Sequence, residues 1–266
     1  MRILQQRGAL VALAAIAGVL VSAGCGSSSN TDSAHVRAVN VASSAGNAAV
    51  TVNGGAIDGN LAFGQISNYN FIGQSSSLFG FTTSVTFTTP TTLPVGPTLT
   101  LSTGSFYTGY LIGRADTAIT TTDPRFLQSV VTGDRGASAS YTPSLPYTPP
   151  PTGSANIRIL NAAPDAGPVD VLINGRTAYA AVAYPRFPTV PSGSPAGTPA
   201  PAVNPVTAYL AVSASAPTIQ VNAAGTATVL VPATPLPVLS GNVYTVLITE
   251  PTITPTTTYG LQTVPD

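Results

Sequence analysis

Acidic side chains are the residues of this chain whose spacing could support catalysis. Asp165 and Asp170 flank a turn, and Asp116, Asp123 and Asp134 follow one another in a segment further upstream. Two carboxylates are sufficient for glycoside hydrolysis, in which one acts as an acid and the other as a base or nucleophile. Such an enzyme also needs aromatic platforms for its sugar, and the chain contains no tryptophan. A weak carboxylate-based hydrolase of the glycoside type is therefore the alternative hypothesis for the function of this chain.

The same carboxylates have a structural interpretation, which we favour. Asp165 follows Pro164, and an aspartate in that position stabilises a turn by accepting a hydrogen bond from nearby backbone. Asp170 begins a strand-like segment, and we predict a structural ion pair between Asp170 and Arg158 on a neighbouring strand. An exposed pair of this kind contributes less than about 1 kcal/mol, so it would fix strand register more than stability.

Histidine, cysteine and metal chemistry are poorly supported. His35 is the only histidine, and a Ser-His-Asp triad needs an imidazole placed to take the proton of the nucleophile. Zinc needs three or four His, Cys or carboxylate ligands, and Cys25 is the only cysteine. The acidic groups lack the D-x-D-x-D-like spacing of a calcium loop. We therefore predict no catalytic residue, no metal and no cofactor.

The N-terminal segment has the pattern of a secretion signal. Arg2 and Arg7 precede an apolar run over 8–21, which is too short for a comfortable transmembrane helix and is typical of a signal peptide. The run ends in the letters SAGC, which resemble the lipobox of bacterial lipoproteins, with serine at the position where leucine is usual. We predict a signal peptide over 1–24.

The lipobox resemblance implies that Cys25 carries a lipid and becomes the mature N-terminus. Gly26 stands where inner-membrane lipoproteins have aspartate, which implies an anchor in the outer membrane of a bacterial cell envelope. Residues 25–33 would then form a flexible polar tether. The alternative is an ordinary signal peptide with cleavage nearby and an unmodified thiol. In the lipoprotein interpretation the first partner of the chain is the membrane itself.

The mature chain after residue 24 carries little charge. All nine basic residues of the full sequence are arginines, and loss of the two in the signal peptide leaves seven against nine carboxylates, a net charge of 7 − 9 = −2. Nucleic-acid binding requires a concentrated basic face, so we expect no nucleic-acid partner. Charged residues make up only 7% of the sequence, and a surface of Thr, Ser, Asn and Gln suits a secreted β-protein.

The sequence contains an internal repeat, in which one stretch occurs in two similar copies. The letters AHVRAVNVASSAGNAAVTVNG, which begin at Ala34, match ANIRILNAAPDAGPVDVLING, which begin at Ala155, without a gap. A later match aligns Tyr107-Thr108 with Tyr244-Thr245, and the larger offset there implies an insertion in the second copy. The proline-rich loop over 185–205 accounts for that insertion, because its prolines prevent regular strand pairing.

Each copy reads as β-structure. Alternating apolar segments end in Asn-Gly, at Asn53-Gly54 and Asn174-Gly175, and this dipeptide is the strongest short signal for a β-hairpin. Helical periodicity with caps is missing after Cys25. The sequence therefore predicts an all-β protein with two tandem β-sandwich domains, immunoglobulin-like or similar. We place them at 34–136 and 155–266, joined by a stiff Pro/Ser-rich linker over 137–154.

The duplicated stretches, each followed by a Tyr-Thr strand, resemble the modules of the domain-of-unknown-function family 4397 of bacterial secreted proteins and lipoproteins. The resemblance is more specific in the second copy, where APDAGPVDV retains Asp165 and Asp170. Both copies have asparagine, Asn40 and Asn161, where members of this family often carry histidine. The family implies a β-rich module and no particular activity.

Aromatic residues divide into two groups. Tyrosines at matched places in the two copies are expected to serve packing, because every copy needs them. Aromatic residues in the linker and around the proline-rich loop have no counterpart, and we predict a recognition surface there, with Tyr141, Tyr147, Tyr184 and Phe187. The first hypothesis is thus a non-enzymatic cell-envelope lipoprotein whose paired β-modules bind an envelope protein or glycan, or act as a structural extension.

Overall fold

The structure is a computed structural model of the 266-residue chain. It describes residues 33–52, 55–73, 76–77, 79–83, 91–92, 99–101, 104–115, 123, 125–134, 148–185, 206–252 and 258–266. Outside these residues lie the predicted signal peptide, Cys25, Asp116, Tyr141, Tyr147, Phe187 and most of the predicted linker and proline-rich loop. Among the described residues there is no helix of the length and hydrophobicity that a bilayer crossing requires.

The described strands before residue 134 form what we call the first lobe. One sheet has the order β10-β9-β1-β4, a second sheet has the order β3-β2-β6-β7, and β5 pairs with β8. The strand bounds are β1 Ser33–Asn40, β2 Ala48–Val52, β3 Gly55–Leu61, β4 Asn70–Gly73, β5 Ser76–Ser77, β6 Phe79–Thr83, β7 Thr91–Thr92, β8 Leu99–Thr100, β9 Phe106–Ile112 and β10 Gln128–Gly133.

The described strands from residue 154 onward form the second lobe. Its sheets have the orders β18-β17-β11-β14 and β13-β12-β15-β16. The strand bounds are β11 Ser154–Asn161, β12 Val169–Ile173, β13 Arg176–Val182, β14 Leu210–Ser213, β15 Thr218–Ala223, β16 Val229–Pro235, β17 Val243–Thr252 and β18 Thr258–Pro265. Strand for strand, these orders repeat those of the first lobe, including a parallel pair, β1 with β9 and β11 with β17. The structure therefore shows the predicted all-β, sandwich-like fold.

The Asn-Gly turn of the second lobe has the geometry that the sequence predicts. Asn174 and Gly175 join β12 to β13 with φ values of 49° and 75°. Left-handed backbone at both positions is the requirement of a tight type I′ hairpin turn, and asparagine followed by glycine meets it with little strain. Asn53-Gly54, the matching dipeptide, lies outside the described residues.

Two asparagines at matched positions of the duplicated stretch, Asn40 and Asn161, have structural roles in both lobes. Asn161 is fully buried, and its amide donates to the carbonyls of Gly167 and Val182 while its oxygen accepts from the Ala163 amide. Asn40 makes the equivalent three hydrogen bonds in the first lobe. Because each amide satisfies buried backbone groups, these residues hold the chain crossing after β1 and after β11.

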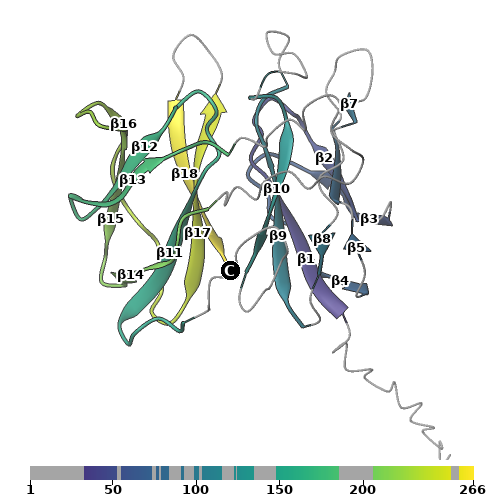
Figure 1. Ribbon diagram of the computed structural model, residues 1–266, viewed down its shortest axis with the longest axis horizontal. Helices are drawn as coiled ribbons and strands as arrows, with labels where there is room; N and C mark the ends of the chain where they lie inside the picture. Colours follow the sequence, from purple (N-terminus) through teal and green to yellow (C-terminus); the bar gives the residue numbers. More distant parts are fainter. Residues whose placement is uncertain are drawn as a thin grey trace, which may run out of the picture.

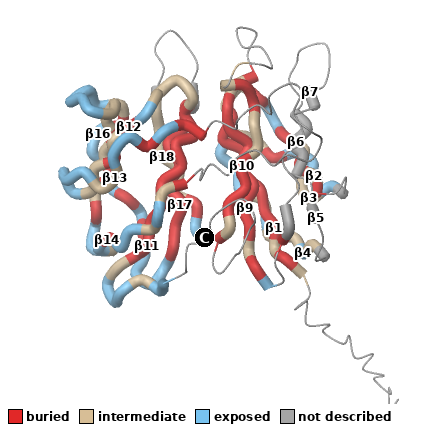
Figure 2. The backbone as a smooth tube through the Cα atoms, in the orientation of Figure 1, coloured by how far each residue is buried: buried red, intermediate tan, exposed pale blue. Residues whose placement is uncertain are grey.

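The central sheets are buried on both faces. On β11, Ile157 and Ile159 pack into the core of the second lobe, whereas Leu160 packs outward against the first lobe. Figure 1 shows the two lobes side by side, with β9 and β10 facing β17 and β18 across the middle. In Figure 2 β9 and β17 are mostly red, while β13, β14 and β16 at the outer side are largely pale blue. The lobes are thus packed together, in contrast to the separated arrangement that a stiff linker suggests.

Candidate functional site between the lobes

An apolar contact surface, which we call the seam, joins the two lobes. The first lobe contributes β-branched and aromatic residues of β1, β9 and β10, and the second contributes residues of β11, β17, β18 and the chain next to the proline-rich loop. The buried members are Val39, Val41, Tyr110, Ile112, Val130, Leu160, Ala162, Tyr184, Val206, Leu247 and Val264. Burial of this apolar area is the main force that holds the lobes together.

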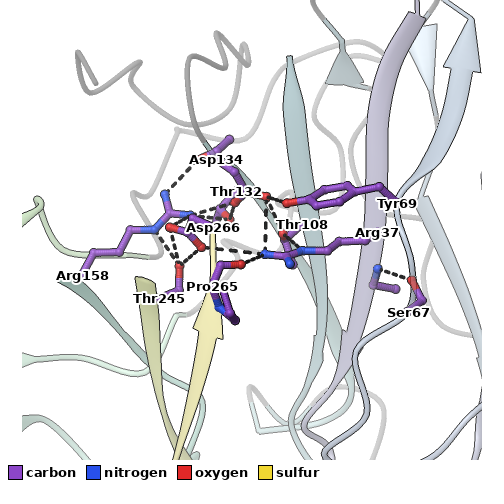
Figure 3. Close-up of polar contacts among 12 residues, drawn as sticks. Arg37, Ser67, Tyr69, Thr108, Thr132, Asp134, Arg158, Thr245, Pro265 and Asp266 are labelled. Carbon is purple, nitrogen blue, oxygen red and sulfur yellow. Dashed lines mark hydrogen bonds and ion pairs between the residues drawn. The ribbon is translucent and has the colours of Figure 1, made fainter. Parts of the chain in front are cut away.

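Arg158 crosses the seam and binds both lobes (Figure 3). Its Nη2 donates to the Asp134 carboxylate at 3.0 Å and lies 3.2 Å from the Asp266 carboxylate. Its Nη1 donates to the Gly133 carbonyl at 2.8 Å, and its Nε donates to the Thr245 hydroxyl at 2.8 Å. Only 3% of the arginine side chain is exposed, so these partners replace water around a buried charge.

Arg37 occupies the matching position on the first lobe. Its Nε donates to the Thr108 hydroxyl at 2.9 Å, and its Nη2 donates to the Pro265 carbonyl of the second lobe. The same nitrogen lies 3.9 Å from both the Asp134 and the Asp266 carboxylates. Each lobe therefore sends one arginine towards a carboxylate pair shared between the lobes, and we call these four residues the charge cluster.

A tyrosine completes each half of the charge cluster. The Tyr69 ring lies 4.5 Å from the Arg37 guanidinium, and its hydroxyl donates to Asp134 at 3.0 Å. Tyr209 lies 4.9 Å from the arginine of the second lobe, and its hydroxyl donates to Asp266 at 2.7 Å. An aromatic face attracts a cation, and a phenol hydroxyl donates a hydrogen bond to a buried carboxylate. Both contacts therefore stabilise the charges within the seam.

Burial governs the electrostatics of the charge cluster. Desolvation raises the pKa of Asp134 to about 6, and the neighbouring Asp266 acts in the same direction while Arg158 and Arg37 oppose it. Desolvation likewise raises the pKa of Tyr69 and of Tyr209. The carboxylate pair resembles an acid–base pair in composition, but both aspartate side chains are 0% exposed. In this arrangement they contact other parts of the chain and have no surface open to a substrate.

A second polar group lies at the edge of the seam. The Asp165 carboxylate of the second lobe pairs with Arg114 and, at 2.9 Å, with Arg125 of the first lobe. Arg125 also binds Asp123 at 2.9 Å. The backbone amide of Asp165 donates to the buried carboxyl of Glu250 at 2.7 Å. The Asp165 carboxylate thus joins the two lobes.

The structure corrects the predicted ion pair between Arg158 and Asp170. Arg158 lies on β11 in the sheet at the seam, whereas Asp170 lies on β12 in the outer sheet of the same lobe. The Asp170 carboxylate instead accepts hydrogen bonds from the backbone amides of Ala181 and Gly225. These two amides lower the pKa of Asp170. The prediction failed because the two residues belong to different layers of the sandwich.

The structure also corrects the placement of Tyr184 on a recognition surface. Tyr184 is 7% exposed and belongs to the seam. Its hydroxyl accepts a hydrogen bond of 2.7 Å from the Gln128 side chain on β10 of the first lobe. Burial raises the pKa of this phenol. Tyr184 therefore anchors the start of the proline-rich loop to the opposite lobe.

The carboxylates considered for catalysis do not gather into one described group. Asp165 and Asp123 lie at the edge of the seam with arginines, Asp134 lies in the charge cluster, and Asp170 binds backbone amides of the outer sheet. The described residues contain no group of three or more His, Cys, Asp or Glu side chains that could hold a metal ion.

Sequence reasoning missed the charge cluster, although two signals pointed to it. Arg37 and Arg158 stand at matched positions of the duplicated stretch, which indicates a shared role. The letters of the strands that carry or face them, FYTGYLI and SANIRILN, also place apolar residues side by side instead of at every second position, and the structure buries nearly all of these residues. Strands of this kind are covered on both faces, so a partner surface beyond the sandwich itself was required.

Comparison with models of known protein families gives a match over the second lobe. Residues 155–266 match the model of the family described as Domain of unknown function (DUF4397). The match begins one residue after the start of β11 and ends with the chain's final residue, Asp266, so it takes in all eight strands of the second lobe. None of the curated proteins matches the chain.

Proposed function

We propose that this chain is a non-enzymatic lipoprotein of the bacterial cell envelope, in which two DUF4397-like β-lobes form one body for binding or structural extension. The observation that carries the proposal is the arginine–carboxylate bond of Arg158 and Asp134, buried between the lobes. It supports a structural role for these two charged side chains. The similarity of residues 155–266 to a domain family of unknown function supports no particular activity.

The anchor is the second part of the proposal. Cys25 would carry the lipid, and the chain from there to the start of β1 at Ser33 would be the tether. Lipidation would place both lobes outside the cytoplasm, with the membrane as the first partner. An envelope protein or glycan would be the second partner, and residues 186–204 of the proline-rich loop are the first place to seek its contact.

Metabolic labelling with an alkyne fatty acid tests the anchor. The full-length chain should incorporate the label and co-sediment with outer membranes, whereas Cys25→Ser should do neither. Cys25→Ser replaces one small residue, so a folded but unlabelled variant is the expected control. An unlabelled wild-type chain would refute the lipoprotein interpretation.

Two further measurements separate binding from hydrolysis. Capture from envelope extract should retain a partner with the lipidated wild-type chain and lose it when residues 186–204 are deleted. Incubation with envelope polysaccharide should release no reducing ends. Release that Asp165→Asn or Asp123→Asn abolishes would instead establish the hydrolase.

A further inference from the structure

Three aromatic rings lie side by side on neighbouring strands β9, β1 and β4 of the first lobe. His35 on β1 is paired with Phe71 on β4 and with Phe106 on β9, so the three side chains are register neighbours. The imidazole stacks on Phe106 at 4.2 Å between ring centroids and contacts Phe71 at 4.8 Å. Phe71 is 58% exposed, although it is among the largest apolar side chains. We call these three residues the aromatic row.

The aromatic row is confined to one lobe of an otherwise duplicated molecule. The equivalent register in the second lobe holds Asn156 on β11, Ala211 on β14 and Val243 on β17. The fold itself therefore does not require aromatic rings at these positions, since the second lobe forms the same strand pairs without them. A feature that one copy has and the other lacks is better explained by a contact that only the first lobe makes.

That lobe is the one that the anchor would hold against the membrane. Seven residues, 26–32, lie between Cys25 and Ser33, the first residue of β1, and His35 follows two residues later. Even fully extended, the eight Cα-to-Cα steps from Cys25 to Ser33 span at most about 29 Å. The aromatic row therefore stays within a short distance of the bilayer whenever Cys25 is acylated. None of its three side chains is acidic, so anionic lipids would not repel it.

We propose that the aromatic row is a membrane-contacting surface that places Phe71 among the lipid head groups and so orients the two-lobed body on the bilayer. This inference rests on the proposed lipid anchor. Aromatic rings favour the interfacial zone of a bilayer, where a weak contact suffices once a lipid has removed the cost of bringing the protein to the surface. A single exposed ring would not bind a membrane by itself.

The absence of tryptophan from the sequence gives a clean test. Phe71→Trp creates a sole tryptophan within the aromatic row, and Ala211→Trp creates one at the matched exposed position of the second lobe. Each lipidated full-length variant is reconstituted into phosphatidylethanolamine and phosphatidylglycerol vesicles, with or without brominated phosphatidylcholine. Intact-mass measurement of the same samples records acylation of Cys25.

On vesicles, Phe71→Trp should shift its emission to shorter wavelength and lose at least half its intensity to the brominated lipid, while Ala211→Trp should change little. An acylated protein whose Phe71→Trp emission is unshifted and unquenched would overturn this inference and leave the anchor standing. An unacylated Cys25 would overturn the anchor and, with it, this inference. A shift that depends on protein concentration without vesicles would assign the aromatic row to a second copy and would equally overturn it.

Discussion

Arg158 of the second lobe donates to the Asp134 carboxylate of the first lobe at 3.0 Å, and both side chains are almost completely buried. The two residues are separated by a segment of chain that the sequence predicts as a linker. Their bond shows that the second lobe is not a free appendage of the first. Charges at such a depth persist only where partners on several strands replace their hydration.

Replacement of Arg158 by methionine should destabilise the protein strongly. The change leaves Asp134 and Asp266 close together in the seam without their nearest cation, and loss of one partner of a buried pair typically costs about 3–5 kcal/mol. Urea denaturation followed by circular dichroism measures the effect. Arg176→Met on β13 is the matched control, because Arg176 is exposed and its loss should cost less than about 0.5 kcal/mol. Equal losses in the two variants would contradict the buried-pair argument.

The ion pair of Arg125 and Asp165 should contribute far less. Its side chains are 41% and 22% exposed, so water screens the attraction that it makes across the edge of the seam. A double-mutant cycle with Arg125→Ala and Asp165→Ala should give a coupling energy below about 1 kcal/mol. Asp165 also pairs with Arg114, and Arg125 also pairs with Asp123, so each single change removes a second contact and only the coupling energy isolates this pair. A coupling energy above about 2 kcal/mol would contradict this prediction, because a value of that size is typical of buried ion pairs.

Glu250 should make the protein more stable in mild acid than in mild alkali. Burial raises the pKa of Glu250 from 4.5 to about 7, against the opposing effect of the Asp165 backbone amide. The folded protein therefore holds this proton more tightly than the unfolded chain, so the associated stability is lost as pH rises from about 4.5 through 7. Desolvation of Asp134, whose pKa is raised to about 6, acts in the same direction at slightly lower pH.

Substitution of Glu250 by glutamine isolates this contribution. The variant should match the wild type at pH 4, where this carboxyl is mostly protonated in both the folded and the unfolded chain, and exceed it at pH 8 by about 1–3 kcal/mol. Denaturation midpoints at the two pH values measure the difference. A variant that is less stable than the wild type at pH 8 would show that the ionised carboxylate is well compensated.

Gly175→Ala should weaken the hairpin between β12 and β13. Gly175 has a φ of 75°, a left-handed conformation that costs an alanine about 1 kcal/mol. Space is not the cause, because a Cβ atom at this position would meet no atom within 4 Å. Gly59→Ala is the matched control, since Gly59 on β3 is equally open and has no positive φ. Thermal unfolding should therefore show a lower Tm for the first variant only.

The sequence by itself determined the secondary structure and the duplication. Period-two alternation and Asn-Gly turns depend on local backbone geometry, so β12, β13 and the turn at Asn174 could be predicted without knowledge of the rest of the chain. By the same local rule, the apolar and β-branched letters over 106–112 and 128–131 predict two strands, which correspond to β9 and most of β10. The letters over 66–72 also predict a strand, but β4 begins only at Asn70, because the hydroxyl of Ser67 accepts from the Ala38 amide in place of a regular ladder.

Only the tertiary structure decided which surfaces meet. Alternation tells which residues share a face of a strand, but it does not tell what covers that face. Arg158 therefore found its partners in Asp134 and Asp266 instead of Asp170, and Tyr184 entered the seam instead of the surface. Both outcomes depend on the docking of two whole sheets. That docking is a balance of apolar burial and charge compensation across segments far apart in the chain, and local sequence patterns do not record it.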